Sequence, residues 1–314
     1  MNMQKIRHHL LLILRGCAMG AADVVPGVSG GTIAFITGIY EELINSIKSI
    51  DIQALKLLLT FQWKAFWKKI NGIFLLSVII GIGISIFSLA KIMTWLLEHH
   101  PIQIWSFFFG LIIASSILVA KEIKQWKIST IISLFIGIFI AYWITITTPT
   151  STPDSWWFII LSGAIAICAM ILPGISGAFI LLLMGKYSYI LEAVSKFDIE
   201  ILFLFAIGAI VGIISFSHLL SWLLKNHHTI TVSLLTGFML GSLNKVWPWK
   251  ETLQTYIDSH GIEKALIEKN ISPRHFADLT QNDPQIVQAI LLCLLGFLLI
   301  YGIELFAQKL QKKI

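Results

Sequence analysis

A short motif rich in proline and glycine interrupts the apolar sequence of this chain twice. It reads Pro26-Gly27-Val28-Ser29-Gly30-Gly31 in the first half and Pro173-Gly174-Ile175-Ser176-Gly177-Ala178 in the second. Proline and several glycines are costly inside a helix, so each copy predicts a break between two helices. Apolar sequence resumes directly after each copy. We therefore expect each copy to be an unwound turn that leads into a helix N-terminus, where free N–H groups and the helix dipole favour an anion.

The composition predicts that these breaks lie within a membrane. Of the 314 residues, 56% are hydrophobic and 13% are charged, and long apolar segments recur along the whole chain, as in polytopic membrane proteins. Irregular backbone is tolerated in a bilayer only where protein or a water-filled cavity surrounds it. Two breaks at corresponding places in two halves are typical of a transporter with a site near the midplane. The net charge of +6 is explained by membrane topology and does not indicate a nucleic-acid partner.

Cysteine usage predicts no metal centre and no disulfide framework. The three cysteines lie in apolar segments and have no motif spacing, as expected of small buried side chains. We therefore expect no metal and no other cofactor.

The similarity between the halves extends beyond the motif. Positions 26–46 align with 173–193, and Gly81 aligns with Gly208 within a further series of matches in the same order. This pattern predicts an internal duplication. The first repeat spans 1–147 and the second spans 156–314.

The predicted fold is an all-α polytopic membrane protein with inverted repeats. The apolar segments 31–46 and 175–193 are too short to cross a bilayer. Each is therefore paired with the segment before it as a re-entrant helical hairpin. Each repeat then has three crossing helices and one hairpin, and the odd number of crossings inverts the second repeat relative to the first.

The distribution of basic residues predicts the orientation. Lys and Arg gather at the N-terminus, in the 48–70 linker, in the 121–127 loop and at the C-terminus, so both termini are expected to be cytoplasmic. Residues 248–284 then form an external loop. Within the linker, apolar residues at steps of three or four with lysines between them predict a basic amphipathic helix over 51–70. It either lies on an anionic membrane surface or packs on its own protein.

Two inverted turns would bring their helix N-termini together near the midplane. Converging dipoles with the hydroxyls of Ser29, Thr32 and Ser176 would form an anion seat. The alternative is that the glycines only permit close helix packing.

Several ionisable residues are candidates for the same anion. Arg15 lies at bilayer depth, where it either binds a phosphate or reaches the cytoplasmic headgroups. Asp23 either caps the first turn or carries a coupling proton, and Na⁺ is the other candidate coupling ion. Lys91, His218 and Lys186 are candidate contacts for a charged headgroup, with anchoring at the membrane interface as the alternative for the first two.

The run from Gly20 through Asp23 to Thr32, together with the second motif copy, resembles the bacterial polyprenyl-phosphate transporter family. The resemblance implies a flippase that returns undecaprenyl phosphate from the outer to the inner leaflet of the bacterial plasma membrane, which recycles the lipid carrier of cell-wall synthesis. It also implies a phosphate site formed by the motif residues of both copies, namely Asp23, Pro26, Gly27, Ser29, Gly30, Gly31, Thr32, Pro173, Gly174, Ser176 and Gly177. The second copy departs from the first at Ala178 and has Met170 in place of Asp23.

Two other functions fit parts of the pattern. Both motif copies contain the Gly-x-Ser-Gly sequence of rhomboid-type intramembrane serine proteases, which need a histidine base beside the serine. His218 is the one well-placed histidine for two serines, so we predict a transporter and not an enzyme. A small-anion transporter is the other alternative.

Overall fold

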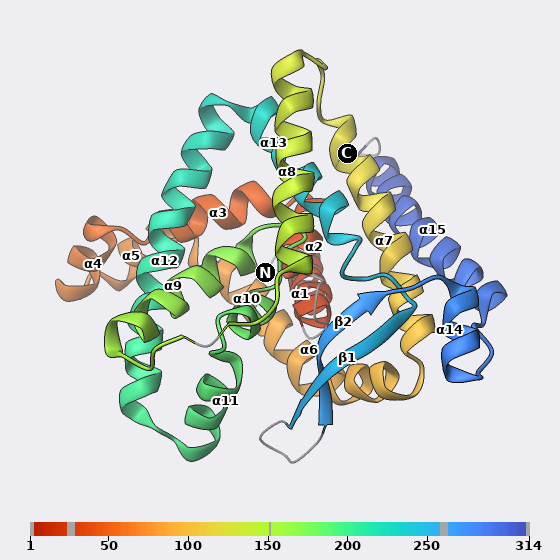
Figure 1. The fold of residues 1–314 in the computed structure, drawn as a ribbon. Helices are drawn as coiled ribbons and strands as arrows, with labels where there is room; N and C mark the ends of the chain where they lie inside the picture. Colours follow the sequence, from red (N-terminus) through yellow and green to blue (C-terminus); the bar gives the residue numbers. More distant parts are fainter. Residues whose placement is uncertain (1–2, 24–28, 151, 258–262, 312–314) are drawn as a thin grey trace. The chain divides into compact units, whose positions relative to one another are not determined.

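The computed structural model describes residues 3–23, 29–150, 152–257 and 263–311. The chain forms two compact units (Figure 1). Unit 1 comprises Met1–Met93 and Ser151–Thr231, and unit 2 comprises Thr94–Thr150 and Val232–Ile314. Each unit takes residues from both halves of the sequence, so the units and the predicted repeats are different divisions of the chain.

Unit 1 is helical throughout its described secondary structure. Its elements are α1 (Met3–Asp23), α2 (Gly30–Ile36), α3 (Tyr40–Lys48), α4 (Ile52–Leu59), α5 (Trp63–Lys69), most of α6 (Gly72–His99), α9 (Trp156–Ile171), α10 (Gly177–Leu183), α11 (Tyr187–Lys196), α12 (Ile199–Asn226) and the start of α13 (His228–Ser242). Unit 2 contains the end of α6, α7 (Pro101–Lys121), α8 (Ile128–Ile146), most of α13, β1 (Lys250–Ile257), β2 (Glu263–Asn270), α14 (Pro273–Thr280) and α15 (Ile286–Gln311).

The predicted class, a mostly helical polytopic membrane protein, is confirmed. Among the described residues, the three helices α7, α8 and α12 are long and apolar enough to cross a membrane. Two bent helix pairs also qualify together: α5 with α6, bent by 71°, and α10 with α11, bent by 113°. The count of candidate spans therefore rises to five if each pair is one span. The inverted relation of the repeats stays a prediction.

Glycines at matching sequence positions permit the same helix contact in both halves. A Cβ added at Gly81 of α6 would lie 2.1 Å from the carbonyl oxygen of Ile13 in α1. A Cβ added at Gly208 of α12 would lie 1.9 Å from the carbonyl oxygen of Ile160 in α9. Small residues allow membrane helices to approach backbone to backbone, because a side chain at the crossing would push them apart. The aligned glycines thus explain why α1 packs on α6 and α9 on α12.

The return segment of each predicted hairpin is two short helices. Residues 31–46 are divided between α2 and α3, and residues 175–193 between α10 and α11. The breaks contain Gly38 and Gly185, whose φ angles are +72° and +64°. Glycine adopts this left-handed conformation readily at a helix end. The sequence analysis aligned these two glycines but did not predict the breaks.

The segment expected to form one amphipathic helix over 51–70 also forms two helices. These are α4 and α5, and Phe61 between them has a φ of +54°. A left-handed residue ends a helix, because the next residues cannot continue its hydrogen-bond ladder.

The external loop predicted over 248–284 has structure that the sequence analysis did not foresee. Strands β1 and β2 pair antiparallel, with Lys250 opposite Asn270 and Ile257 opposite Glu263. Trp249, directly before β1, and Ile271, directly after β2, form a buried apolar cluster with Ile102 and Ala289. The hairpin and α14 are therefore packed parts of unit 2.

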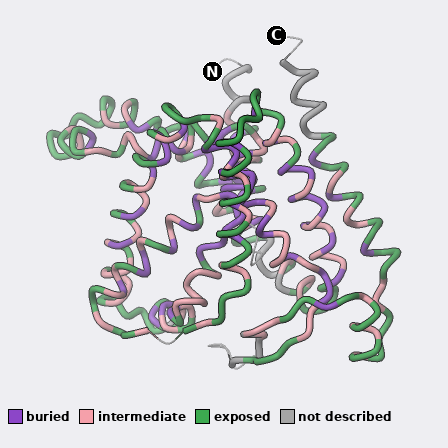
Figure 2. The backbone as a smooth tube through the Cα atoms, turned by 45° about the horizontal axis from the view of Figure 1, so that its top comes forward, coloured by how far each residue is buried: buried purple, intermediate pink, exposed green. Residues whose placement is uncertain are grey.

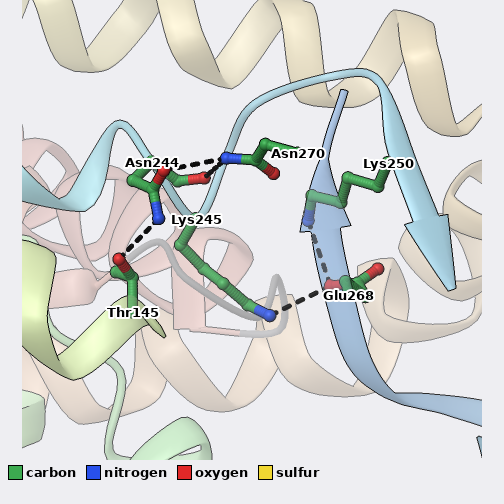
Figure 3. Close-up of polar contacts among 6 residues, drawn as sticks. All are labelled: Thr145, Asn244, Lys245, Lys250, Glu268 and Asn270. Carbon is green, nitrogen blue, oxygen red and sulfur yellow. Dashed lines mark hydrogen bonds and ion pairs between the residues drawn. The ribbon is translucent and has the colours of Figure 1, made fainter. Parts of the chain in front are cut away.

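A polar cluster holds the open end of this hairpin (Figure 3). Glu268 Oε2 accepts hydrogen bonds from Lys245 Nζ at 3.0 Å and from Lys250 Nζ at 3.2 Å. Asn270 Nδ2 donates to Asn244, whose own Nδ2 donates to Thr145 Oγ1 of α8 at 2.7 Å. These contacts join both strands to the helices of the same unit.

Candidate functional site

The structure brings the two motif copies into direct contact within unit 1. Ser29 Oγ donates to the carbonyl oxygen of Met170 at 3.0 Å. The backbone N–H of Gly174 donates to Thr32 Oγ1 at 2.9 Å. Tyr40 Oη adds a bond to the carbonyl oxygen of Ile171 at 3.2 Å. The turn of one half is therefore completed by groups from the other half.

The N-terminus of α2 has its backbone donors engaged by its own half. Asp23 Oδ1 accepts from the N–H of Gly30 at 2.7 Å, and Ser29 Oγ accepts from the N–H of Gly31 at 3.1 Å. The N–H of Thr32 bonds to the carbonyl oxygen of Ser29 at 2.9 Å. A serine N-cap and a carboxylate next to the first turn are favourable partners for a helix start. The Asp23 carboxylate thus occupies the place where an external anion would bind.

The N-terminus of α10 differs because Met170 replaces the carboxylate. Ser176 Oγ caps the helix by accepting from the N–H of Phe179 at 3.4 Å. In the described part of the chain, the Ser176 hydroxyl hydrogen and the N–H groups of Gly177 and Ala178 have no acceptor. The second turn therefore retains donors that the first turn has already engaged.

The departure from the motif at Ala178 has a steric reason. Its counterpart Gly31 is buried, and a Cβ there would lie 2.3 Å from the carbonyl oxygen of Ile171. Ala178 is exposed. A side chain is excluded only where the turns meet, so the first copy requires glycine and the second does not.

The remaining motif residues shape the second turn. Pro173 is buried, and Gly174 has a φ of +84°, a conformation that residues with a Cβ rarely adopt. Gly177 packs against α9, where a Cβ would lie 2.5 Å from the carbonyl oxygen of Ala166. Pro26 and Gly27 of the first copy lie outside the described residues.

The predicted ionisable ligands lie apart from these turns. Arg15 is half-buried on α1 and interacts electrostatically with Glu42 of α3. His218 is exposed on α12, and its Nδ1 lies 2.8 Å from the carbonyl oxygen of Ile214 in the same helix. Lys91 lies on α6, and its side chain is outside the described set. Among the described contacts, no hydrogen bond or ion pair joins Arg15 or His218 to either turn.

Lys186 belongs to the break between α10 and α11, where it is almost fully buried, with a relative exposure of 1%. Its ammonium group forms an ion pair with Asp154 and donates to the carbonyl oxygen of Thr152 at 3.0 Å. The ring centroids of Phe158 and Tyr189 lie 5.6 and 5.2 Å from Nζ. Thr152 Oγ1 also donates to the carbonyl oxygen of Met184 at 2.5 Å. Lys186 therefore holds the α8–α9 connection against this break.

The geometry around the serines is unsuited to a serine nucleophile. A nucleophilic serine needs a base that accepts its proton. Ser29 donates its proton to a backbone carbonyl, and no histidine in the described part of the chain hydrogen-bonds to Ser29 or Ser176. The same residues contain no group of three or more His, Cys, Asp or Glu side chains that could hold a metal ion.

Comparison with known proteins gives the family. Residues 19–264 match the model of a family described as undecaprenyl phosphate translocase-like. The chain belongs to this family. It is 48% identical over 310 residues to a polyprenyl-phosphate transporter of Vibrio cholerae serotype O1, covering 97% of this chain and 99% of that protein. It is 35% identical over 258 residues to a polyprenyl-phosphate transporter of Staphylococcus aureus, covering 75% of this chain and 85% of that protein. No solved structure matches the chain significantly. The family and both relatives bear the names of transporters and not of enzymes.

Four partners in these contacts were missed by the sequence analysis. The carbonyl groups of Met170 and Ile171 bind Ser29 and Tyr40, but backbone atoms leave no signal in a sequence. Tyr40 did leave one, because it aligns with Tyr187 in the duplication. Asp154 lies in a polar loop, where a single carboxylate does not stand out.

Proposed function

We propose that this chain transports polyprenyl phosphate across the bacterial plasma membrane. It returns undecaprenyl phosphate from the outer to the inner leaflet, where the lipid carrier of cell-wall synthesis is reused. The observation that carries this proposal is the identity of 48% with a polyprenyl-phosphate transporter over nearly the full length of both chains. The apolar helices and the paired turns support it.

The paired turns are the proposed phosphate seat, with unequal roles. The second turn supplies the direct donors, namely the Ser176 hydroxyl and the N–H groups of Gly177 and Ala178. The first turn positions them, since Ser29 and Thr32 are bonded to the second copy. A phosphate that leaves water loses hydration, and charge-assisted hydrogen bonds at a helix start offset this loss. We propose that the Arg15 guanidinium binds the phosphate headgroup when the lipid reaches the inner leaflet.

Asp23 is the proposed carrier of a coupling proton. Its carboxylate accepts the N–H of Gly30, and protonation of that carboxylate would weaken the bond. The first turn would then shift, and the hydrogen bond from Ser29 to the carbonyl oxygen of Met170 would change with it. A proton gradient should therefore drive transport by the wild type but not by Asp23→Asn, whereas a Na⁺ gradient should drive neither.

The decisive experiment measures movement of the lipid between leaflets. The purified protein is reconstituted in three sets of vesicles. The first has a labelled polyprenyl phosphate in its membrane, the second has the uncharged alcohol of that lipid in its membrane, and the third has inorganic phosphate in its lumen. We expect protein-dependent movement of the phosphorylated lipid alone. Equal movement of the alcohol would show that the phosphate is not recognised. Release of inorganic phosphate would favour a small-anion transporter.

A further inference from the structure

The α4–α5 pair exposes large apolar side chains that the proposed phosphate seat does not use. Relative exposures are 82% for Ile52, 69% for Leu59, 76% for Phe61 and 57% for Trp63. In Figure 2 the pair, at the left as in Figure 1, is coloured almost entirely as exposed or intermediate. Exposed apolar side chains that gather on one pair of short helices indicate a site of interaction with a membrane or another molecule.

The lysines of α5 fall into two groups. Lys69 donates to Asp51 Oδ2 and to Gln53 Oε1, both at 3.0 Å, so it joins α5 to α4. Lys64 and Lys68 of α5 are exposed, and neither has an ion-pair partner in the described part of the chain. Asp51 is the one acidic residue over 51–70. The surface therefore carries an excess of positive charge beside its apolar side chains.

The orientation of α5 suits a position along a bilayer surface. Its axis is bent by 71° from the apolar stretch Gly72–Ser88 of α6. If that stretch runs across the bilayer, α5 lies close to the membrane plane, as interfacial amphipathic helices do. Asn71 at the junction donates from Nδ2 to Glu42 Oε1 of α3 at 2.9 Å, which fixes the bend to the rest of the unit.

A groove of about 610 Å³ opens between α5 and the start of α6. Its lining includes Trp63, Lys64, Trp67, Lys68, Gly72 and Ile73. The tryptophans are four positions apart and so are the lysines, so each pair lies along one side of α5. Gly72 makes room for the Trp67 ring, because an added Cβ would lie 2.5 Å from that ring. The groove thus combines an aromatic wall with two ammonium groups.

We propose that this groove binds one anionic phospholipid of the surrounding bilayer. The ammonium groups of Lys64 and Lys68 hold its phosphate, and the indole rings with Ile73 hold its glycerol and the first part of its acyl chains. A net negative lipid such as phosphatidylglycerol is favoured over a zwitterionic one, since Lys64 and Lys68 are cationic and none of the described residues that line the groove is acidic. This site lies apart from the paired turns, so the inference does not depend on the proposed function.

The test uses the full chain purified in detergent and mixed with phosphatidylglycerol and phosphatidylcholine of identical acyl chains. Native mass spectrometry then gives the retention of each lipid. A basic residue at a membrane surface contributes about fivefold to anionic-lipid binding, so Lys64→Gln/Lys68→Gln should lower phosphatidylglycerol retention by about 25-fold. Retention of phosphatidylcholine should not change.

Two further variants keep the test decisive. Lys124→Gln/Lys127→Gln removes the same charge from exposed positions in the α7–α8 loop and should retain the lipid. Gly72→Ala keeps every charge but displaces Trp67, and it should lose the lipid. Equal loss in the loop variant, or no preference for phosphatidylglycerol in the wild type, would overturn the proposal. Thermal unfolding of each variant identifies any that fail to fold. If the double lysine variant does not fold, lipid retention by Gly72→Ala decides the test.

Discussion

At the scale of single residues, the two serines of the duplicated motif have different partners. Ser29 donates across the copies to Met170 and accepts from Gly31, so both its hydrogen and its oxygen are engaged. Ser176 only accepts, from Phe179, and retains its hydrogen. In the sequence the two serines are equivalent, because a duplicated motif does not reveal which copy bonds to the other.

This difference predicts that the same substitution, serine to alanine, affects lipid binding at one position and stability at the other. Ser176→Ala should weaken binding of a polyprenyl phosphate by about tenfold to a hundredfold, since a hydrogen bond to a charged group contributes about 1.5–3 kcal/mol. Ser29→Ala should mainly lower the thermal unfolding midpoint, because it removes a helix cap and a buried bond between the copies. Binding titrations with the lipid and its alcohol, next to thermal unfolding, separate the two effects. Normal lipid binding by Ser176→Ala would contradict the proposed seat.

The pair Gly31 and Ala178 provides a steric test of how the copies meet. Gly31→Ala places a Cβ 2.3 Å from a buried carbonyl oxygen, so the turns must separate. We expect it to reduce the yield of monodisperse protein severely. Ala178→Gly removes one methyl group at the aligned position. Because Ala178 is exposed, this change should be tolerated. Size-exclusion profiles of the two variants check this, and similar losses for both would mean that the turns do not meet at Gly31.

At the scale of elements, the turn between α10 and α11 differs from its counterpart between α2 and α3 by one buried charge. Lys186 and Ile39 align, and each has a relative exposure of 1%. Since the first turn is stable with an aliphatic side chain, Lys186→Ile should fold. Lys186→Ala should be less stable than Lys186→Ile, because both variants lose the ion pair with Asp154 but only alanine leaves a cavity. Thermal unfolding of the two variants in the same detergent tests this, and a stable Lys186→Ala would show that the buried lysine does not hold the turn.

The hairpin of β1 and β2 should respond to pH through Lys250 and Glu268. Burial lowers the pKa of Lys250 to about 8, although the charge of Glu268 opposes this shift. Burial alone would raise the pKa of Glu268, but the charges of Lys250 and Lys245 outweigh it and the pKa is lowered. Between about pH 8 and the ordinary lysine pKa near 10.4, the unfolded chain binds more protons at Lys250 than the folded chain. This group therefore raises stability as the pH rises through that window.

The measurement is hydrogen exchange of the hairpin amides between pH 8 and 10, corrected for the intrinsic rate. Protection should rise with pH in the wild type, and Lys250→Met should remove the rise. The slope has the same sign below the ordinary glutamate pKa, where stability falls as the pH falls, because protonation of Glu268 loses the attraction of both lysines. If protection still rose with pH in Lys250→Met, the pH dependence would belong to another group.

The elements also show what the sequence could predict. The Pro-Gly breaks, the apolar helices and the duplication were predicted because proline, glycine and hydrophobicity act locally. The breaks at Gly38 and Gly185 were not, since one glycine is tolerated within a helix and only the fold decides its φ. Strands β1 and β2 were missed because they are rich in polar and charged residues that do not alternate with apolar ones, and because the anchoring cluster at their open end stabilises their pairing.

At the scale of the whole molecule, each unit is assembled from both halves of the sequence. This arrangement requires the chain to pass between the units in α6, after Thr150 and in α13. The candidate site, by contrast, lies within unit 1 alone. The duplication predicted which residues would correspond, but not that the two motif copies would bond to each other, because such contacts depend on packing between distant segments.

The orientation in the membrane is the testable property of the whole chain. The asymmetry of basic residues predicts that the α7–α8 loop is cytoplasmic and that α14 is external. A cysteine at Asp278 of α14 should react with a membrane-impermeant maleimide on intact cells, whereas one at Lys124 should react only after permeabilisation. The three native cysteines are first replaced. If the cysteine at position 124 were labelled on intact cells, the predicted orientation in the membrane would be wrong.

The bonds between the motif copies also constrain how the protein is made. Ser29 and Thr32 are synthesised 141 and 142 residues before their partners Met170 and Gly174. At about 5–20 residues per second, the ribosome needs roughly 7–30 s to supply those partners. During that interval the first turn is held by the bonds within its own copy, in which the N–H groups of Gly30, Gly31 and Thr32 donate to Asp23 and Ser29. We therefore expect the nascent first turn to serve as the template on which the second turn is completed, and a chain truncated before Met170 to be a substrate for membrane proteases.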